Sequence, residues 1–440
     1  MRSTLSIQPF LRIQSLHRSS IIVHTRKQFQ TITSSKTTIP KRSGWAGYKL
    51  MRELDRKKFD VMVVSPSTSV GSLEFRCVTE PVRGYSKDID YYQATCDDID
   101  VESKVIHCTS QVPETKKTTF SLEYDILVIS VGSYSNTFGI PGVKEHALFL
   151  RDVDHARSIR KRLIECFEYA SQPGLTETQK RNRLHFVVAG AGPTGIEFSA
   201  ELYDFISRDA SRLYPELIRF ISMTLYDVAP HILNGFDSDL SSYAHQHFDR
   251  KGIRIKTQRF VESVMEDKLI IRNEGEVPYG LLVWSTGLCE NPLVTKLDVA
   301  KDDRKQRILT NSHLQVLDKS HIPYPDLFAI GDCATMKNQD LPLTAQVATQ
   351  KAMYLSKVLN GNGSIQEFEF RNRGMMAYIG GSEALVDMSS VHQGAKNSGR
   401  LAWLLWRSAY FSMSMSIRNR LLIPHYWLLT WIFGRDITRF

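Results

Sequence analysis

The sequence predicts an α/β fold with two parallel-sheet domains, the second inserted into the first, followed by a helical C-terminal segment. Short segments that are apolar on both faces alternate with helical patterns, as strands and helices of parallel α/β domains do. Two glycine motifs, 44–47 and 192–195, recur at an offset of 148. Two strands that end at Gly132 and Gly287 recur at an offset of 155, and the similar offsets indicate two related domains.

The apolar pattern locates the individual elements. A helical pattern covers residues 48–54, and a second helix carries Phe198, Leu202 and Phe205 on one face. Buried strands are expected at residues 59–64, 125–131, 185–189, 223–226 and 281–285. The resulting domain limits are 1–42 for a presequence and linker, 43–150 and 306–370 for the two parts of the first domain, 151–305 for the inserted domain and 371–440 for the C-terminal region.

The N-terminal segment carries most of the excess charge of the chain. The formal net charge is +9 over 440 residues, whereas residues 1–52 hold ten basic residues and no acidic one. This Arg- and Ser-rich segment has scattered apolar residues rather than one apolar run, which is typical of a mitochondrial transit peptide; an unstructured basic tail is the alternative. The remainder is close to neutral, so nucleic acid is not an expected partner.

Cysteine spacing and apolar run lengths exclude some classes of protein. The six cysteines form no C-x-x-C pair and no regular framework, which favours reduced, buried thiols. The absence of a C-x-x-x-x-C pair after the first strand argues against a disulfide reductase. The long apolar runs at 408–417 and 421–434 lie between arginines and are too short for straight helices that cross a bilayer. The chain is therefore expected to lie on a membrane rather than to span it.

The strongest motif is HFVVAGAGPTGIE at residues 185–197, a buried strand that runs into G-x-G-x-x-G and a helix. Gly190 permits a tight turn, Gly192 lets the backbone approach a pyrophosphate, and Gly195 lets helix and strand pack closely. The phosphates then bind free N–H groups at the positive end of the helix. This order of elements predicts a Rossmann-like dinucleotide-binding domain.

An acidic residue and a Gly-Asp pair extend this prediction. Asp227 ends the next strand, where an acid binds ribose hydroxyls and disfavours a 2′-phosphate, so NADH is preferred over NADPH. It follows Gly195 by 32 residues rather than the usual ~20, so an exposed strand-end Asp is the alternative. Gly331 and Asp332 end another apolar strand, where the carboxylate can bind a ribityl hydroxyl; a helix N-cap is the alternative.

Four motifs in order carry a specific resemblance: GAGPTGIE, VWSTG, FAIGDCA and LPLTAQVATQKAMYL, at residues 190–197, 283–287, 328–334 and 341–355. From Ser43 onward the chain resembles the type II (alternative) NADH:quinone oxidoreductases of fungal mitochondria. The resemblance implies a flavoprotein that passes electrons from NADH through FAD to ubiquinone without pumping protons. It also implies peripheral attachment to the lipid surface of the mitochondrial inner membrane through C-terminal helices, and we expect a homodimer.

The resemblance implies which residues bind NADH. Gly190, Gly192, Gly195 and Asp227 match the NADH site, and Glu197 matches the acid beside the nicotinamide; a first-turn helix acid is its alternative.

The same comparison assigns residues to the flavin and the quinone. Gly44, Gly47, Gly331 and Asp332 match FAD contacts, and Gly132 and Gly287 match strand ends near the two cofactors. Gln346 and Gln350 match the quinone-binding segment, and Thr349 stands where some relatives have His.

The C-terminal region has a stripe of apolar residues edged by arginines. Trp403, Trp406, Tyr410, Met413 and Ile417 follow spacings of 3, 4, 3 and 4. Such a stripe suits a helix that lies in a membrane interface, and a core or dimerisation helix is the alternative.

The chain departs from the family at its flavin end. Arg42 stands where the first glycine of the turn is expected, the apolar strand before it is missing, and so is an aromatic segment after Pro66. Either coding segments were lost from the deduced sequence, or the chain is a degenerate, non-catalytic NADH-binding paralogue. A sulfide:quinone reductase is a further alternative, for which Cys289 and Cys333 would have to form a redox pair.

Overall fold

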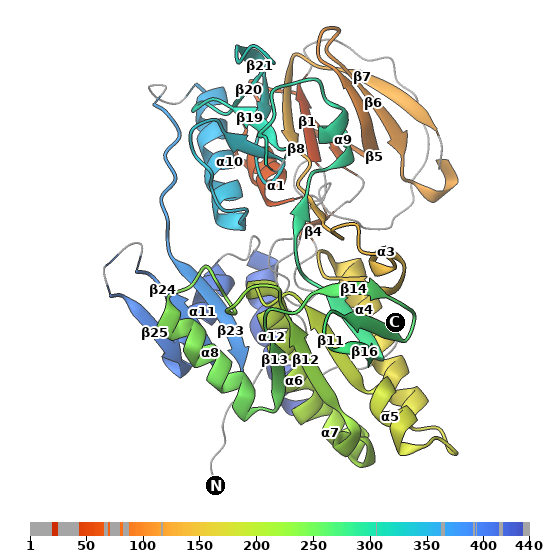
Figure 1. Cartoon of the computed structure of the whole chain (residues 1–440). Coiled ribbons are helices and arrows are strands. Elements are labelled where there is room, and N and C mark those ends of the chain that lie inside the picture. Colours follow the sequence, from red (N-terminus) through yellow and green to blue (C-terminus); the bar gives the residue numbers. More distant parts are fainter. Residues whose placement is uncertain are drawn as a thin grey trace.

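The computed structural model describes residues 20–24, 44–65, 69–70, 80–81, 88–115, 118–304, 306–361, 366–389, 392, 394–412 and 417–433. Figure 1 shows two lobes: one is built around the larger sheet with helices α1 and α10, and the other around β11–β13 with helices α4–α8. Arg42 and the segment directly after Ser65 lie outside the described residues, so the expectations about the first glycine of the turn and about the missing aromatic segment stay predictions.

The larger sheet has ten strands among the described residues, in the order β22-β19-β20-β21-β8-β1-β2-β5-β6-β7. Its centre contains β2 (Val61–Ser65), β8 (Ile126–Ser130) and β21 (Pro323–Ala329), where β21 and β8 pair in parallel. On one side β5 (Ile89–Asp100) pairs in parallel with β2 and continues antiparallel into β6 (Val105–Ser110) and β7 (Thr119–Glu123). On the other side β20 (Gln315–Leu317) and β19 (Ile308–Thr310) follow β21 in antiparallel order, and β22 (Ala334–Met336) pairs in parallel with β19. Helices α1 (Trp45–Glu53) and α10 (Ala345–Leu359) bury their apolar faces in one core cluster with residues of β2 and β21.

A strand from the N-terminal segment lies in the middle of this sheet. Strand β1 (Ser20–His24) pairs antiparallel with β2 on one side and with β8 on the other. The sequence places these residues in a presequence and predicts that the first strand of the domain is missing. A vacant position between β2 and β8 would leave the backbone groups of both strands unpaired, and β1 satisfies them from the opposite chain direction.

The second sheet is parallel throughout and belongs to the inserted domain. It contains β10 (Leu148–Phe149), β17 (Leu281–Trp284), β11 (His185–Ala189), β12 (Ser222–Tyr226) and β13 (Ile253–Lys256), in this order. Helices α4 (Val153–Ala170), α5 (Glu177–Arg183), α6 (Pro193–Phe205), α7 (Ser211–Leu213) and α8 (Ser238–Arg250) belong to the same lobe. The expected strands at 185–189, 223–226 and 281–285 are thereby confirmed.

The chain crosses between the domains twice. Strand β9 (Tyr134–Ser135) leads into the inserted domain and pairs antiparallel with β18 (Leu288–Cys289), which leads out of it. Shorter elements complete the two lobes: β3 (Ser69–Val70), β4 (Glu80–Pro81), α3 (Val143–His146), β14 (Val261–Val264), β15 (Lys268–Ile271), β16 (Gly275–Pro278) and α9 (Pro292–Lys296). The predicted insertion of one domain into the other is confirmed.

The C-terminal region begins as a sheet and only then becomes helical. Strands β23 (Met375–Gly380), β24 (Glu383–Asp387) and β25 (Lys396–Gly399) form an antiparallel sheet, followed by α11 (Arg400–Ser412) and α12 (Ile417–Phe433). None of the helices in the described part of the chain combines the length and apolar character needed to cross a membrane.

The two tryptophans of the predicted apolar stripe, whose side chains the structure describes, face the protein rather than the outside. Trp403 and Trp406 are 9% and 5% exposed and belong to the core cluster that contains β23, β24 and α6. The exposed apolar side chains of α11 are instead Leu401, Leu404 and Leu405. The core-helix alternative therefore describes the two tryptophans, because burial of two indoles against a sheet outweighs their suitability for a membrane interface.

Candidate functional site

The glycine turn joins β11 to α6 as predicted. Gly190 has a φ of +106°, and a Cβ there would lie 2.9 Å from the Thr286 side chain. A Cβ on Gly195 would lie 1.8 Å from the Gly190 carbonyl oxygen, whereas nothing lies within 4 Å of one on Gly192. Gly195 therefore permits close helix–strand packing, and Gly192 leaves an open approach to the backbone at the N-terminus of α6.

Asp227 lies at this turn despite its long spacing. It follows β12, its Oδ2 accepts a hydrogen bond from the Ala191 N–H, and its Oδ1 accepts one from the Ala229 N–H at 2.7 Å. The additional residues form a π-helical turn at Ile206–Ala210, helix α7 and a 3-10 helix at Pro215–Phe220 before β12 begins. The extension therefore lengthens the connection without displacing the strand end from the turn.

Glu197 is fully buried on α6 and connects it to the C-terminal sheet. Its Oε1 accepts a hydrogen bond from the Tyr378 backbone N–H at 2.9 Å. Further along the helix, Asp204 accepts hydrogen bonds from the Tyr378 hydroxyl and from the Gly381 N–H. No sequence motif indicates Tyr378 or Asp204, because their contact joins residues 174 positions apart.

At the flavin end, two strand ends meet. Gly132 and Ser133 follow β8, Gly331 and Asp332 follow β21, and the Ser133 hydroxyl donates a hydrogen bond to Asp332 Oδ2 at 3.3 Å. Arg151 in turn donates from Nη2 to the Ser133 hydroxyl at 3.2 Å. Asp332 and Arg151 are 2% and 8% exposed, so this chain of contacts is buried. Sequence reasoning missed Ser133 and Arg151, since neither belongs to a motif.

Helix α1 presents its N-terminus to the same region. Gly44 is its N-cap residue and supplies no side chain to the first-turn N–H groups, while Gly47 is buried one turn further. A Cβ on Gly331 would lie 3.3 Å from the Ala46 Cβ, so the first turn of α1 and the Gly331 loop are neighbours. A helix N-terminus without a capping side chain can bind a phosphate through its N–H groups.

Buried polar groups without a hydrogen-bond partner in the protein show whether these residues fit FAD. Arg151 Nη1 is buried and has no hydrogen-bond partner within the described ranges. The uncapped α1 N-terminus, this Arg151 amino group and the Asp332 carboxylate provide donors and an acceptor of the kinds that phosphate and ribityl groups require. The residues present therefore fit the flavin.

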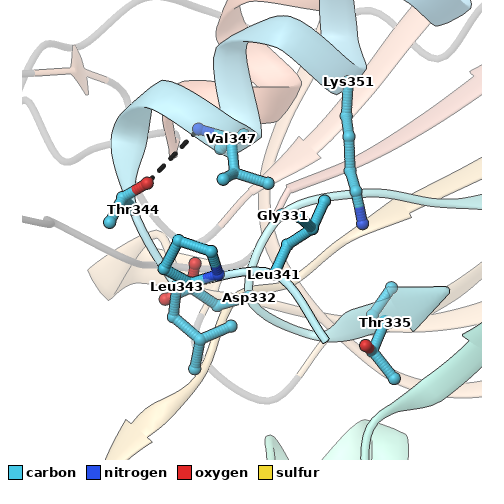
Figure 2. A pocket seen from close by; sticks show the side chains of 11 residues that line it. Gly331, Asp332, Thr335, Leu341, Leu343, Thr344, Val347 and Lys351 are labelled. Carbon is cyan, nitrogen blue, oxygen red and sulfur yellow. Dashed lines mark hydrogen bonds between the residues drawn. The ribbon is translucent and has the colours of Figure 1, made fainter. Parts of the chain in front are cut away.

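A pocket lies between the Gly331 loop and the N-terminus of α10, as Figure 2 shows. Thr344 caps this helix by accepting a hydrogen bond from the Val347 N–H at 3.3 Å. The residues that line the pocket come from three short segments: Gly331, Asp332, Ala334 and Thr335; Leu341–Thr344; and Val347, Ala348 and Lys351.

Gly287 lies where the two crossovers between the domains touch. Its carbonyl accepts a hydrogen bond from the Asn136 N–H at 3.3 Å, and a Cβ on it would lie 2.4 Å from the Phe138 ring. The Trp284 indole N–H donates to the Asn136 carbonyl at 2.9 Å. These contacts hold the strand end of the second sheet beside the segment that follows Gly132.

The two predicted quinone residues hold a loop. Gln350 Nε2 donates to the Arg371 carbonyl at 2.9 Å, and Gln350 Oε1 accepts from the Arg371 N–H at 3.0 Å. Gln346 Oε1 accepts from the Arg373 N–H at 2.8 Å, and both glutamines also contact each other. They therefore anchor the segment that leads into β23, and neither lines the pocket of Figure 2.

Most of the chain is similar to known proteins. Residues 43–352 match the model described as pyridine nucleotide-disulphide oxidoreductase, and residues 372–436 match that described as NDH2 C-terminal domain. A probable NADH dehydrogenase of Dictyostelium discoideum is 38% identical, with 95% of this chain and 94% of the relative covered. The chain belongs to the type II NADH dehydrogenase family.

Two further proteins are similar to this chain over most of their own length. The internal alternative NAD(P)H-ubiquinone oxidoreductase A1, mitochondrial, of Solanum tuberosum is 38% identical and covers 90% of this chain and 86% of itself. The NDH2 of Plasmodium falciparum, solved in complex with NADH, superposes with a TM-score of 0.82 at 26% identity, with 90% and 98% of the two chains covered.

The sulfide:quinone oxidoreductase of Aquifex aeolicus shares the fold at 16% identity and a TM-score of 0.64 over 89% of this chain and 94% of that one. A redox role for Cys333 is disfavoured by its surroundings: burial raises the pKa of its thiol to about 11, so the thiol is protonated at neutral pH. Family membership and this thiol both favour the NADH dehydrogenase interpretation.

Proposed function

We propose that the protein oxidises NADH and reduces ubiquinone through a bound FAD at the mitochondrial inner membrane, without pumping protons. One observation carries the proposal: the strand end at Gly287 in the inserted domain lies beside the segment that follows the strand end at Gly132 in the first domain, through the Gly287–Asn136 and Trp284–Asn136 contacts. Two cofactors bound at these ends would therefore have their reactive parts close together, as transfer of a hydride requires. A bound FAD would supply the chemistry of accepting a hydride and releasing electrons.

The inserted domain, residues 151–305, binds NADH in this proposal. The N–H groups at Gly190–Gly195 bind the pyrophosphate, and Asp227 accepts hydrogen bonds from the ribose hydroxyls. Glu197 orients the nicotinamide end from within α6, where its carboxylate is fixed by Tyr378.

Residues 43–150 and 306–370 bind the flavin. The α1 N-terminus at Gly44–Gly47 binds its pyrophosphate, and Asp332, held by Ser133, binds the ribityl chain. Gly132 and Gly331, with φ of +67° and +79°, let the backbone approach without a side chain in the way. Gln346 and Gln350 border the quinone entrance through the loop that they anchor.

The C-terminal helices attach the protein to the membrane surface. Leu401, Leu404 and Leu405 on α11 and Leu421, Leu428 and Ile432 on α12 are exposed apolar side chains. Arg407 joins the two helices, since its guanidinium lies 5.0 Å from the Trp403 ring centre and 3.7 Å from that of Trp427. An exposed apolar surface beside such an arginine suits a lipid interface. We further propose that the C-terminal region contributes to a homodimer.

Steady-state turnover tests the proposal. The purified protein should be yellow and should reduce a short-chain ubiquinone with NADH as the donor. It should also co-sediment with anionic lipid vesicles, and Leu404→Glu should abolish co-sedimentation without changing turnover with the soluble quinone. A colourless protein that binds NADH and reduces no quinone would overturn the proposed activity and favour a non-catalytic NADH-binding protein.

A further inference from the structure

Lys351 is a buried cation that the described protein groups leave without a partner. It lies on α10 and is 1% exposed, which places it among the largest fully buried side chains. Within the described ranges its ammonium forms neither a hydrogen bond nor an ion pair. Lys is almost never fully buried unless it is paired, so this position requires an explanation.

The side chain points toward the pocket beside Asp332. Figure 2 shows the Lys351 ammonium directed into the space between the Gly331 loop, Leu341 and Thr335. Burial lowers the pKa of this ammonium to about 8, and the nearby Cys333 and Asp332 oppose the shift. The group is therefore largely charged at neutral pH, and its charge faces a pocket bordered by the proposed ribityl-binding carboxylate.

Two buried cations, Arg151 and Lys351, share the surroundings of Asp332. Arg151 reaches Asp332 through Ser133 and has Asp152 near it as well, whereas Lys351 approaches Asp332 from α10. The nearby Arg307 is already paired with Asp302 and Asp340, at 3.1 Å and 2.8 Å. Since the Lys351 ammonium has no hydrogen-bond partner among the described residues, the pocket favours an additional acceptor for it.

We propose that Lys351 is a ligand of the bound flavin, donating a hydrogen bond to one of its acceptor atoms and favouring its reduced, anionic form over its oxidised form. This inference depends on the proposed binding of FAD at the same site. The reduced flavin carries a negative charge that the oxidised ring lacks, so a fixed cation stabilises it more strongly. Lys351 thereby raises the reduction potential of the flavin and its affinity for the protein.

Lys351→Met tests the inference, because methionine keeps an unbranched, apolar side chain and removes the charge. The holoenzyme and the variant are compared by the Kd for FAD, from flavin fluorescence, and by the flavin midpoint potential, from a redox titration. We expect the Kd to rise about tenfold or more, as for loss of a charged hydrogen bond, and the midpoint potential to become more negative. Lys351→Arg should restore part of both values.

The matched control is Lys357→Met, on the exposed side of the same helix. It should leave Kd and potential unchanged. If Lys351→Met does not fold, Lys351→Gln is measured in the same way. A Lys351 variant with unchanged Kd and potential, even with a lower melting temperature, would overturn the inference and leave a structural role. A wild-type protein without bound FAD would instead contradict the proposed function itself.

Discussion

The carboxylate of Asp227 accepts a hydrogen bond from the backbone N–H of Ala191, inside the turn between Gly190 and Gly195. A strand-end acid and the glycine turn thus share one site although many residues separate them in the chain. This contact fixes the acid where the ribose of a dinucleotide bound at the turn is expected.

Two glycines of this turn should respond differently to a methyl group. Gly195→Ala places a Cβ 1.8 Å from the Gly190 carbonyl oxygen, so we expect a loss of about 1–3 kcal/mol in the free energy of unfolding. Gly192→Ala meets nothing within 4 Å, so stability should change by less than about 1 kcal/mol while the Kd for NADH rises. Urea unfolding measures the free energy of unfolding, and an NADH titration measures the Kd. Equal stability of the two variants would argue against the packing role of Gly195.

Asp227→Asn should weaken discrimination between the two nicotinamide cofactors. Without the negative charge, the ribose hydroxyls lose a charged acceptor and a 2′-phosphate is no longer repelled. We expect the Kd for NADH to rise about tenfold and the preference over NADPH to fall, as for loss of one charged hydrogen bond. Asp303→Asn, on the exposed surface, is the matched control. An unchanged NADH/NADPH ratio would remove Asp227 from the ribose site.

Stability should fall between pH 7 and pH 5 because of His185. Burial lowers the pKa of this imidazole to about 4, from 6.5. Its Nδ1 and Nε2 lie 2.7 Å from the Pro278 carbonyl oxygen and 2.8 Å from the Thr224 hydroxyl. Because the folded pKa is lower, the unfolded chain binds more protons in this range, and stability present above pH 6.5 is lost as the pH falls toward 4.

The expected loss from this single group is about 2 kcal/mol between pH 7 and pH 5. Urea unfolding at both pH values measures it, and in His185→Gln the corresponding part of the pH dependence should disappear. A variant that keeps the full pH dependence would show that other groups cause it.

The N-terminal strand should be part of the mature protein. Ile22→Pro removes a backbone donor from the middle of β1, which pairs with strands on both sides, so we expect a loss of about 1–3 kcal/mol. Ile13→Pro, outside the described residues, is the control and should be neutral. Mass spectrometry of the protein isolated from mitochondria should find Ser20; a mature chain that begins after His24 would contradict this role of β1.

Local patterns predicted the parts of the fold that depend on near neighbours in the chain. The strand, turn and helix around Gly190–Gly195 follow from glycine sterics and apolar periodicity, and the strand that ends in Gly331 from an apolar run. The contact of Ser133 and Arg151 with Asp332 could not be predicted from local patterns, because it depends on the path of the chain between the two domains.

Two positions show why a pattern alone is insufficient. Trp403 and Trp406 follow a spacing that suits both a core helix and an interfacial helix, and only the position of β24 decides between them. Residues 20–24 lie in a segment with the composition of a transit peptide, so the sequence did not indicate a strand there. These residues form a strand because they pair with β2 and β8, which are distant in the chain.

The most direct test of the central claim is an anaerobic titration of the purified protein with NADH, followed by absorbance of the flavin. One equivalent of NADH per bound flavin should bleach the visible absorbance band of the oxidised flavin, as expected for a two-electron flavin cofactor. Addition of one equivalent of a short-chain ubiquinone should then restore it. A preparation without flavin absorbance, or a flavin that NADH leaves oxidised, would contradict electron transfer from NADH through FAD to quinone.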